Sequence, residues 1–191
     1  MSRDGELSRR RRVGAGMMLT AWLVRAPLAL IAAVAVAACA SAGAAPAATP
    51  AVRGFDPVAF FSGATTGEGR LKKVFSRSVA THVVGRGRVE HGGTLVLDQT
   101  VTIAGERTRE RQWRLREVAP GRYAGTLTDA RGPVTATVAG PVLTIAYTST
   151  DGMGIAQAIT LAPNGRSARN MMKVKKLGLT VATLAETITR D

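Results

Sequence analysis

Turn-forming residues recur about every ten positions from Arg70 onward, and this spacing restricts the fold more than any other feature of the sequence. The runs between the turns are short and rich in Val, Thr, Ile and Leu. This spacing is typical of antiparallel hairpins rather than of βαβ units. The turn signals are His91-Gly92-Gly93, Ala104-Gly105-Glu106, Pro120-Gly121-Arg122, Arg131-Gly132-Pro133, Gly140-Pro141, Asp151-Gly152 and Pro163-Asn164-Gly165.

Apolar and polar residues alternate within several of these runs. The clearest are Thr94–Ile103, Arg111–Val118 and Val142–Ser149. A period of two residues places one face of each strand in a core and the other in water. Asn170–Arg190 could be helix or strand by pattern, and we expect two final strands around Leu177-Gly178.

A meander of about eight or more such strands has two edges that must be hidden, and closure into a barrel hides both. The sequence therefore predicts an all-β fold, an antiparallel up-and-down β-barrel, over residues 55–191. No long amphipathic helix is expected in this part of the chain.

The amino terminus has the features of an export signal. Six Arg within residues 1–25 precede thirteen uncharged residues, Ala26–Ala38. A helix of that length rises about 20 Å, which is short of the ~30 Å hydrocarbon core of a membrane. We therefore expect residues 1–38 to be a cleaved signal peptide. The sequence leaves the start of translation open among Met1, Met17 and Met18.

The apolar run ends in Val36-Ala37-Ala38-Cys39, which resembles the bacterial lipobox. Cys39 is the single Cys of the chain, so we expect a diacylglycerol anchor there; the alternative is a plain secretory peptide that contains a Cys. Residues 39–54 would then be the lipidated Cys and a flexible Ala/Pro-rich tether. By resemblance to lipoprotein sorting, Ala40 favours the periplasmic face of the outer membrane within the cell envelope.

Residue counts and motifs exclude several kinds of chemistry. One Cys and two His rule out a disulfide framework and a Cys/His zinc cage, so no metal site or cofactor is expected. The sequence contains none of the common motifs of hydrolases, zinc proteases or P-loop proteins, so neither His82 nor His91 lies in such a motif. An enzyme would have to use scattered carboxylates such as Asp98 and Asp129, and we expect a non-enzymatic protein.

The chain is strongly basic, with a formal net charge of +13. Arg107, Arg109 and Arg111 share the strand face of Trp113, whereas Arg114 and Arg116 lie on the other face. Attraction to anionic lipid head groups and a merely soluble basic surface both remain open. Nucleic acid is not an expected partner, because the leader directs the chain out of the cytosol and only eight residues are aromatic.

Together, a series of short motifs resembles a family of Gram-negative lipoproteins known as domain of unknown function three-eight-three-three. The resemblance implies a lipocalin-like barrel with a lipid anchor and supplies no activity. Where relatives tend to show an acidic-acidic-Trp run, this chain has Gln157-Ala158-Ile159-Thr160. The motifs are Phe60-Phe61-Ser62-Gly63, Gly67-Glu68-Gly69, Phe75, Gly93-Thr94-Leu95-Val96-Leu97-Asp98, Gly105-Glu106, Arg111-Gln112-Trp113-Arg114-Leu115, Gly121-Arg122-Tyr123-Ala124-Gly125-Thr126, Asp129-Ala130-Arg131-Gly132, Asn170-Met171-Met172 and Lys176-Leu177-Gly178.

Large side chains inside a barrel can either fill the core or line a ligand cavity. The candidates for a cavity lining are Trp113, Tyr123, Leu143, Ile145 and Tyr147. We expect a binding module for a small apolar or amphipathic ligand, such as a lipid or an anionic amphiphile, held at the membrane by its lipid anchor. The alternatives are an envelope enzyme and a structural lipoprotein without a ligand, and the oligomeric state is left open.

Overall fold

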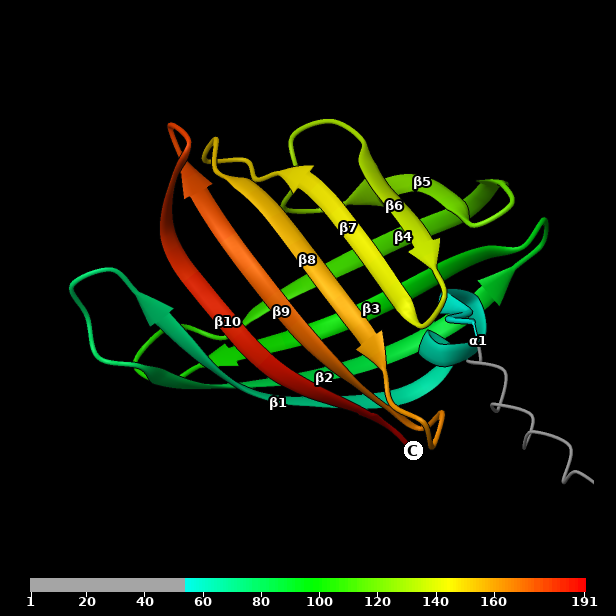
Figure 1. Cartoon of the computed structure of the whole chain (residues 1–191), viewed down its shortest axis with the longest axis horizontal. Coiled ribbons are helices and arrows are strands. Elements are labelled where there is room, and N and C mark those ends of the chain that lie inside the picture. The colour runs from blue at the N-terminus through cyan, green and yellow to red at the C-terminus, as the bar shows by residue number, and fades with distance from the viewer. Residues whose placement is uncertain (1–53) are drawn as a thin grey trace, which may run out of the picture. The chain divides into compact units, whose positions relative to one another are not determined.

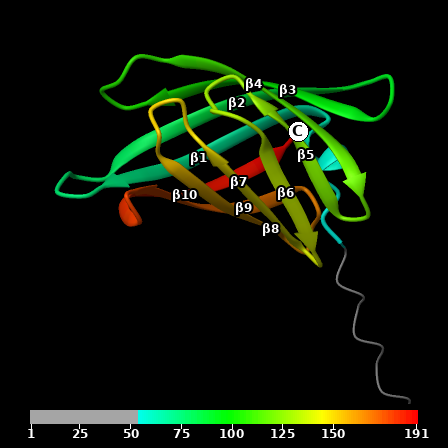
Figure 2. The same ribbon diagram turned by 90° about the horizontal axis from the view of Figure 1, so that it is seen from above.

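A computed structural model describes residues 54–191 and shows a closed barrel of ten antiparallel strands. Each strand pairs with its neighbours in sequence, and β1 pairs with β10 to close the barrel (Figures 1 and 2). The predicted all-β, antiparallel up-and-down barrel is confirmed. The elements are α1 (Pro57–Phe61), β1 (Gly63–Lys73), β2 (Val79–Glu90), β3 (Thr94–Ile103), β4 (Arg109–Ala119), β5 (Arg122–Leu127), β6 (Val134–Ala139), β7 (Val142–Thr148), β8 (Gly154–Leu161), β9 (Ser167–Lys176) and β10 (Leu179–Arg190).

Residues that alternate between apolar and polar in the sequence alternate between the inside and the outside of the barrel. On β7, Leu143, Ile145 and Tyr147 point inward and are buried, while Thr144 and Thr148 are exposed. All seven predicted turns lie at connections between strands. The ambiguous carboxyl-terminal segment forms β9 and β10, as expected, with the turn at Leu177-Gly178.

The short helix α1 fills one end of the barrel. Asp56 caps it, because its carboxylate accepts a 2.9 Å hydrogen bond from the Ala59 N–H. Phe60 and Phe61 pack with Phe55, at ring-centroid separations of 5.0 to 6.3 Å. The Phe61 carbonyl lies directly against Gly87 of β2, where any Cβ would overlap its oxygen. We call this end of the barrel the closed end. Within residues 54–191, no helix has the length and apolarity needed to cross a bilayer.

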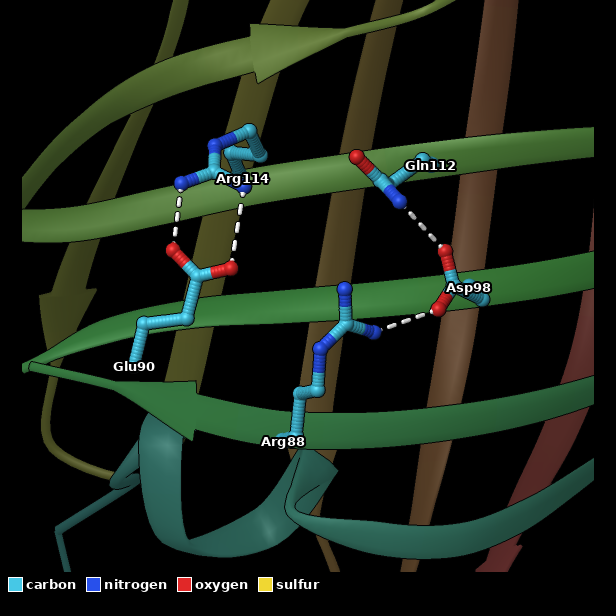
Figure 3. Close-up of polar contacts among 5 residues, drawn as sticks. All are labelled: Arg88, Glu90, Asp98, Gln112 and Arg114. Atoms are coloured by element: carbon cyan, nitrogen blue, oxygen red, sulfur yellow. Dashed lines mark hydrogen bonds and ion pairs between the residues drawn. The ribbon is translucent and has the colours of Figure 1, made fainter.

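Polar side chains bridge β2, β3 and β4 on the outer surface (Figure 3). Asp98 accepts hydrogen bonds from Gln112 at 2.7 Å and Arg88 at 2.6 Å, and both bonds lower the pKa of its carboxyl group. The two terminal nitrogens of Arg114 bind the two carboxylate oxygens of Glu90, at 3.2 and 2.5 Å, and lower the Glu90 pKa in the same way. These contacts tie neighbouring strands together outside the core.

Candidate functional site

A cavity of about 530 Å³ opens at the end of the barrel opposite α1. We call this the open end. It carries the connections β1–β2, β3–β4, β5–β6, β7–β8 and β9–β10 (Figure 1). Lys73 Nζ and Glu106 Oε1, 2.5 Å apart, join the end of β1 to the β3–β4 connection at the rim. The remaining polar rim residues are Arg109, Asp129, Ser149, Thr150 and Asp151.

The wall of this cavity is mostly apolar. Inward-facing positions of β1, β2, β3, β8, β9 and β10 supply aliphatic side chains, and Tyr147 of β7 supplies an aromatic one. Such a wall accepts the apolar part of a small molecule. The apolar lining residues are Leu71, Val83, Val101, Ile103, Met153, Ile155, Met172, Val174, Val181, Ala182 and Leu184.

Buried polar residues lie deeper in the barrel. Gln157, Asn170 and Glu186 line both this cavity and a much smaller one of about 50 Å³ towards the closed end. They therefore separate the open half of the barrel from the filled half. Thr81 also lines the large cavity, and all four side chains are at most 7% exposed. We call Thr81, Gln157, Asn170 and Glu186 the polar layer.

Hydrogen bonds inside the polar layer leave some oxygens without a partner. Asn170 Nδ2 donates to Glu186 Oε2 at 2.9 Å and to Gln157 Oε1 at 3.3 Å. Thr81 Oγ1, Asn170 Oδ1 and Glu186 Oε1 are buried and find no partner among the described residues. A buried polar atom without a partner is costly, and a bound molecule that supplied hydrogen-bond donors would relieve that cost.

The ionisation of Glu186 is set by its surroundings. Burial raises the pKa of its carboxyl group, and this outweighs the hydrogen bond from Asn170 and the positive charge of Arg111, which lower it. A protonated Glu186 can both donate and accept a hydrogen bond. Gly67 makes room for this carboxyl group, since a Cβ on Gly67 would overlap Glu186 Oε1.

Arg111 brings a positive charge to the same depth. Its Nε donates a 2.9 Å hydrogen bond to Gln99 Oε1, which also accepts a 2.8 Å bond from Trp113 Nε1. The Arg111 guanidinium lies 5.4 Å from the centre of the Trp113 ring. Tyr147 packs edge-on against Trp113, at 5.6 Å between ring centroids. These contacts hold Arg111 and Tyr147 at the inner end of the cavity.

The structure separates the five residues proposed from sequence as a cavity lining. Tyr147 lines the large cavity, whereas Trp113, Leu143 and Ile145 line the small one. Tyr123 is buried in the core and lines neither of these cavities. Cys39, the leader and residues 39–53 of the tether lie outside the described residues.

The residues considered for enzyme chemistry are also dispersed. Asp98 lies on the outer surface, whereas Asp129 lines the rim of the cavity, so these two carboxylates do not face each other. His82 is exposed, with its Nδ1 2.6 Å from Glu68 Oε1. Among residues 54–191, no group of three or more His, Cys, Asp or Glu side chains is arranged to hold a metal ion.

None of the four residues of the polar layer was among those expected to line a cavity. Its signal was present: Glu186 lies between Leu184 and Ile188 on the inward face of β10, and Asn170 lies between Ala168 and Met172 on that of β9. A polar residue at an inward position of an alternating strand is the pattern that would have identified both.

Residues 33–190 match the family described as "Protein of unknown function (DUF3833)". The chain belongs to the DUF3833 family. The match confirms the resemblance drawn from the short motifs and covers all ten strands of the barrel. A comparison with curated proteins found no match.

Solved structures similar to this DUF3833 barrel share its fold at low sequence identity. One is the S-type phycobiliprotein lyase CPES of Guillardia theta, with a TM-score of 0.58 and 7% identity, over 70% of this chain and 90% of the lyase. Another is a DUF3598 protein of unknown function from Nostoc punctiforme, with a TM-score of 0.51 and 15% identity, over 76% of this chain. The chain covers 53% of the length of that second protein. The lipocalin-like character of the barrel is thus confirmed.

Proposed function

We propose that this protein is a non-enzymatic binding module that holds one small amphipathic molecule in the open cavity. The observation that carries the proposal is an apolar chamber of about 530 Å³ that ends in buried, unpartnered oxygens. Ligand pockets commonly measure about 300–1,000 Å³ and combine apolar walls with a few polar groups. The likeness to the phycobiliprotein lyase concerns the fold and adds no activity.

The polar layer favours a particular kind of head group. Thr81 Oγ1, Asn170 Oδ1 and Glu186 Oε1 can all accept hydrogen bonds, so a hydroxyl or amino group on the ligand would satisfy them. The ligand would enter polar end first, with its apolar part against the aliphatic wall. An anionic head group, the alternative considered from the basic sequence, would depend on Arg111 and on a protonated Glu186.

We also propose that the protein acts in the cell envelope, held by a lipid on Cys39. The support is the lipobox-like sequence and the single Cys of the chain. A barrel tethered at a membrane would have access to lipids and other amphiphiles, which suit a chamber of this composition.

Displacement of 1-anilinonaphthalene-8-sulfonate from the purified protein tests the binding proposal. Dodecanol, dodecylamine and dodecanoate share a chain and differ in their head group. We expect each amphiphile that binds to reduce the fluorescence, with dodecanol and dodecylamine acting at lower concentration than dodecanoate. The reverse order would support the anionic alternative, and no displacement by any of them would contradict the proposal.

A matched pair of variants locates the binding. Ala182→Phe places a large side chain in the chamber, whereas Ala185→Phe places the same side chain on the outer side of β10. We expect only Ala182→Phe to abolish displacement. Equal effects of the two substitutions would show that the probes bind elsewhere.

A further inference from the structure

Two hairpins at the open end, joined through the paired strands β1 and β10, expose bulky apolar side chains at their tips. Phe75, in the β1–β2 connection, is 105% exposed, and Leu177, in the β9–β10 connection, is 96% exposed. Val74, next to Phe75, and Leu179, two residues after Leu177, are also exposed, at 46% and 72%. The two hairpins are neighbours, because β1 pairs with β10 and the Val74 N–H donates a 2.9 Å hydrogen bond to the Val181 carbonyl (Figure 1). We call Val74, Phe75, Leu177 and Leu179 the apolar tips.

The backbone at both tips adopts a conformation that bulky residues rarely take. Phe75 has φ of 60° and Leu177 has φ of 49°, and within residues 54–191 they are the two non-glycine residues with positive φ. Gly or Asn would adopt this conformation more readily. Local strain of this kind is often found at functional sites. Neither side chain is used in packing, so the fold does not explain why these positions carry Phe and Leu.

Basic side chains surround the apolar tips. The exposed cations are Lys72, Arg77, Lys173, Lys175 and Lys176, from the ends of β1 and β9 and from the β1–β2 connection. Lys73 is paired with Glu106. Among the other connections at the open end, the β5–β6 connection carries one carboxylate, Asp129, at the rim, and the β7–β8 connection carries one, Asp151, which bonds to Ser149. Cations therefore predominate around the tips, and an anionic surface is complementary to them.

We propose that the apolar tips insert into the head-group region of an anionic lipid bilayer, with the surrounding lysines and Arg77 on its phosphates. Apolar side chains projecting from a basic surface match the two layers of such a membrane, since the tips reach acyl chains while the cations stay at the head groups. A protein partner would also cover apolar residues, but the predominance of cations favours the lipid surface. This docking goes beyond ligand binding and does not depend on it.

The docked orientation would bring the mouth of the cavity to the membrane. Lys73 and Val181 line the cavity and lie next to Val74, so the apolar tips adjoin the rim. The chain enters the barrel at the closed end, where the Phe55 N–H bonds to the Gly140 carbonyl. A lipid on the tether would not by itself place the open end on the bilayer, so anchoring and docking can be told apart.

Tryptophan quenching by brominated lipids tests the docking. The full-length protein is reconstituted into phosphatidylcholine vesicles with and without phosphatidylglycerol, each made with brominated or ordinary chains. Phe75→Trp and Leu177→Trp report on the open end. Val118→Trp is the matched control, because Val118 is an exposed apolar residue, 57% accessible, next to the β4–β5 turn at the closed end. The chain already has two Trp, Trp22 in the leader and the buried Trp113, so the emission and quenching of the unsubstituted protein are subtracted as background.

We expect brominated lipid to quench Phe75→Trp and Leu177→Trp, with a blue shift, in the anionic vesicles. High salt, or joint replacement of Lys173, Lys175 and Lys176 by Glu, should remove the quenching. The proposal would be overturned by quenching of Val118→Trp alone or by equal quenching of the three Trp variants. Quenching of the same size with and without phosphatidylglycerol would also overturn it. A blue shift of Phe75→Trp without vesicles would show that a second copy of the protein covers the tips, which would also overturn it.

Discussion

Asn170 and Glu186 are direct register partners on β9 and β10, and Asn170 Nδ2 donates a 2.9 Å hydrogen bond to Glu186 Oε2 inside the barrel. The bond holds a carboxyl group at a depth where burial raises its pKa. The pair thus forms the centre of the polar layer.

Glu186→Gln should make the barrel relatively more stable as pH rises. Because the Glu186 pKa is raised by folding, the unfolded carboxyl group ionises first, above about pH 4.5, and stability falls from there until the folded pKa is passed. Gln has no such titration. Thermal unfolding of both proteins between about pH 4 and about pH 8 measures the effect. We expect the advantage of Glu186→Gln to grow with pH.

The control for this experiment is Glu110→Gln, because Glu110 is an exposed carboxylate on the outer face of β4. A constant stability difference between Glu186→Gln and the unsubstituted protein at every pH would contradict the assignment. Glu90, Asp98 and Glu106 have lowered pKa values, so their contribution to stability rises with pH. Both proteins contain these three residues, so their contribution cancels when the two stabilities are compared.

Gly87→Ala should displace α1 from the closed end. The new Cβ would overlap the Phe61 carbonyl oxygen, and backbone cannot move aside as a flexible side chain can. We expect a loss of about 1–3 kcal/mol in the free energy of unfolding, measured by urea denaturation. Hydrogen exchange at the amides of Phe60 and Ser62, which bond within α1, should accelerate.

Gly154→Ala is the matched substitution for Gly87→Ala. A Cβ on Gly154 would meet one atom, the Lys175 carbonyl oxygen at 3.9 Å, and the backbone there is not left-handed. A gain of about 0.4–1 kcal/mol is expected where Ala fits without strain. If the two substitutions had equal effects, close packing of α1 against β2 would not be the reason for a glycine at position 87.

The architecture was predictable because its determinants are local. Each turn from His91-Gly92-Gly93 to Pro163-Asn164-Gly165 carries residues suited to a hairpin, and several of the runs between them alternate between apolar and polar residues. The β1–β2 turn was not among the predicted ones, because it reaches a left-handed conformation through Phe75 rather than through Gly or Asn. Phe75, the residue that made this turn difficult to predict, is also one of the residues proposed to contact a membrane.

The interior of the barrel was less predictable from the sequence. Alternation indicates that Trp113 and Leu143 face inward, but it does not say how far along the barrel each side chain lies. That depth depends on strand tilt and register, and on α1, which fills the closed end and leaves space at the other. Tyr147 is therefore the one residue of the five candidates that lines the large cavity.

Val96→Ala should destabilise the barrel although Val96 faces outward. Val96 is 0% exposed, and its partners in register are Arg88 on β2 and Arg114 on β4. Arg88 and Arg114, which Figure 3 shows on the outer face, therefore flank Val96, and the stems of such long charged side chains can bury apolar surface. We expect a loss of about 1.5–3 kcal/mol in chemical denaturation. Val118→Ala, at an exposed position, should stay within about 0.5 kcal/mol.

Cys39→Ala should prevent lipid attachment and leave the leader uncleaved. The thiol of Cys39 is the single side chain of its kind in the chain, so no other residue can form the expected thioether. Mass spectrometry of the protein from its own envelope should show acylation of the unsubstituted chain, which should also partition into detergent. Ser41→Ala, two residues away, should behave like the unsubstituted protein. If Cys39→Ala kept the same mass increase and the same partitioning, an anchor at this position would be ruled out, while docking through Phe75 and Leu177 would remain to be tested on its own.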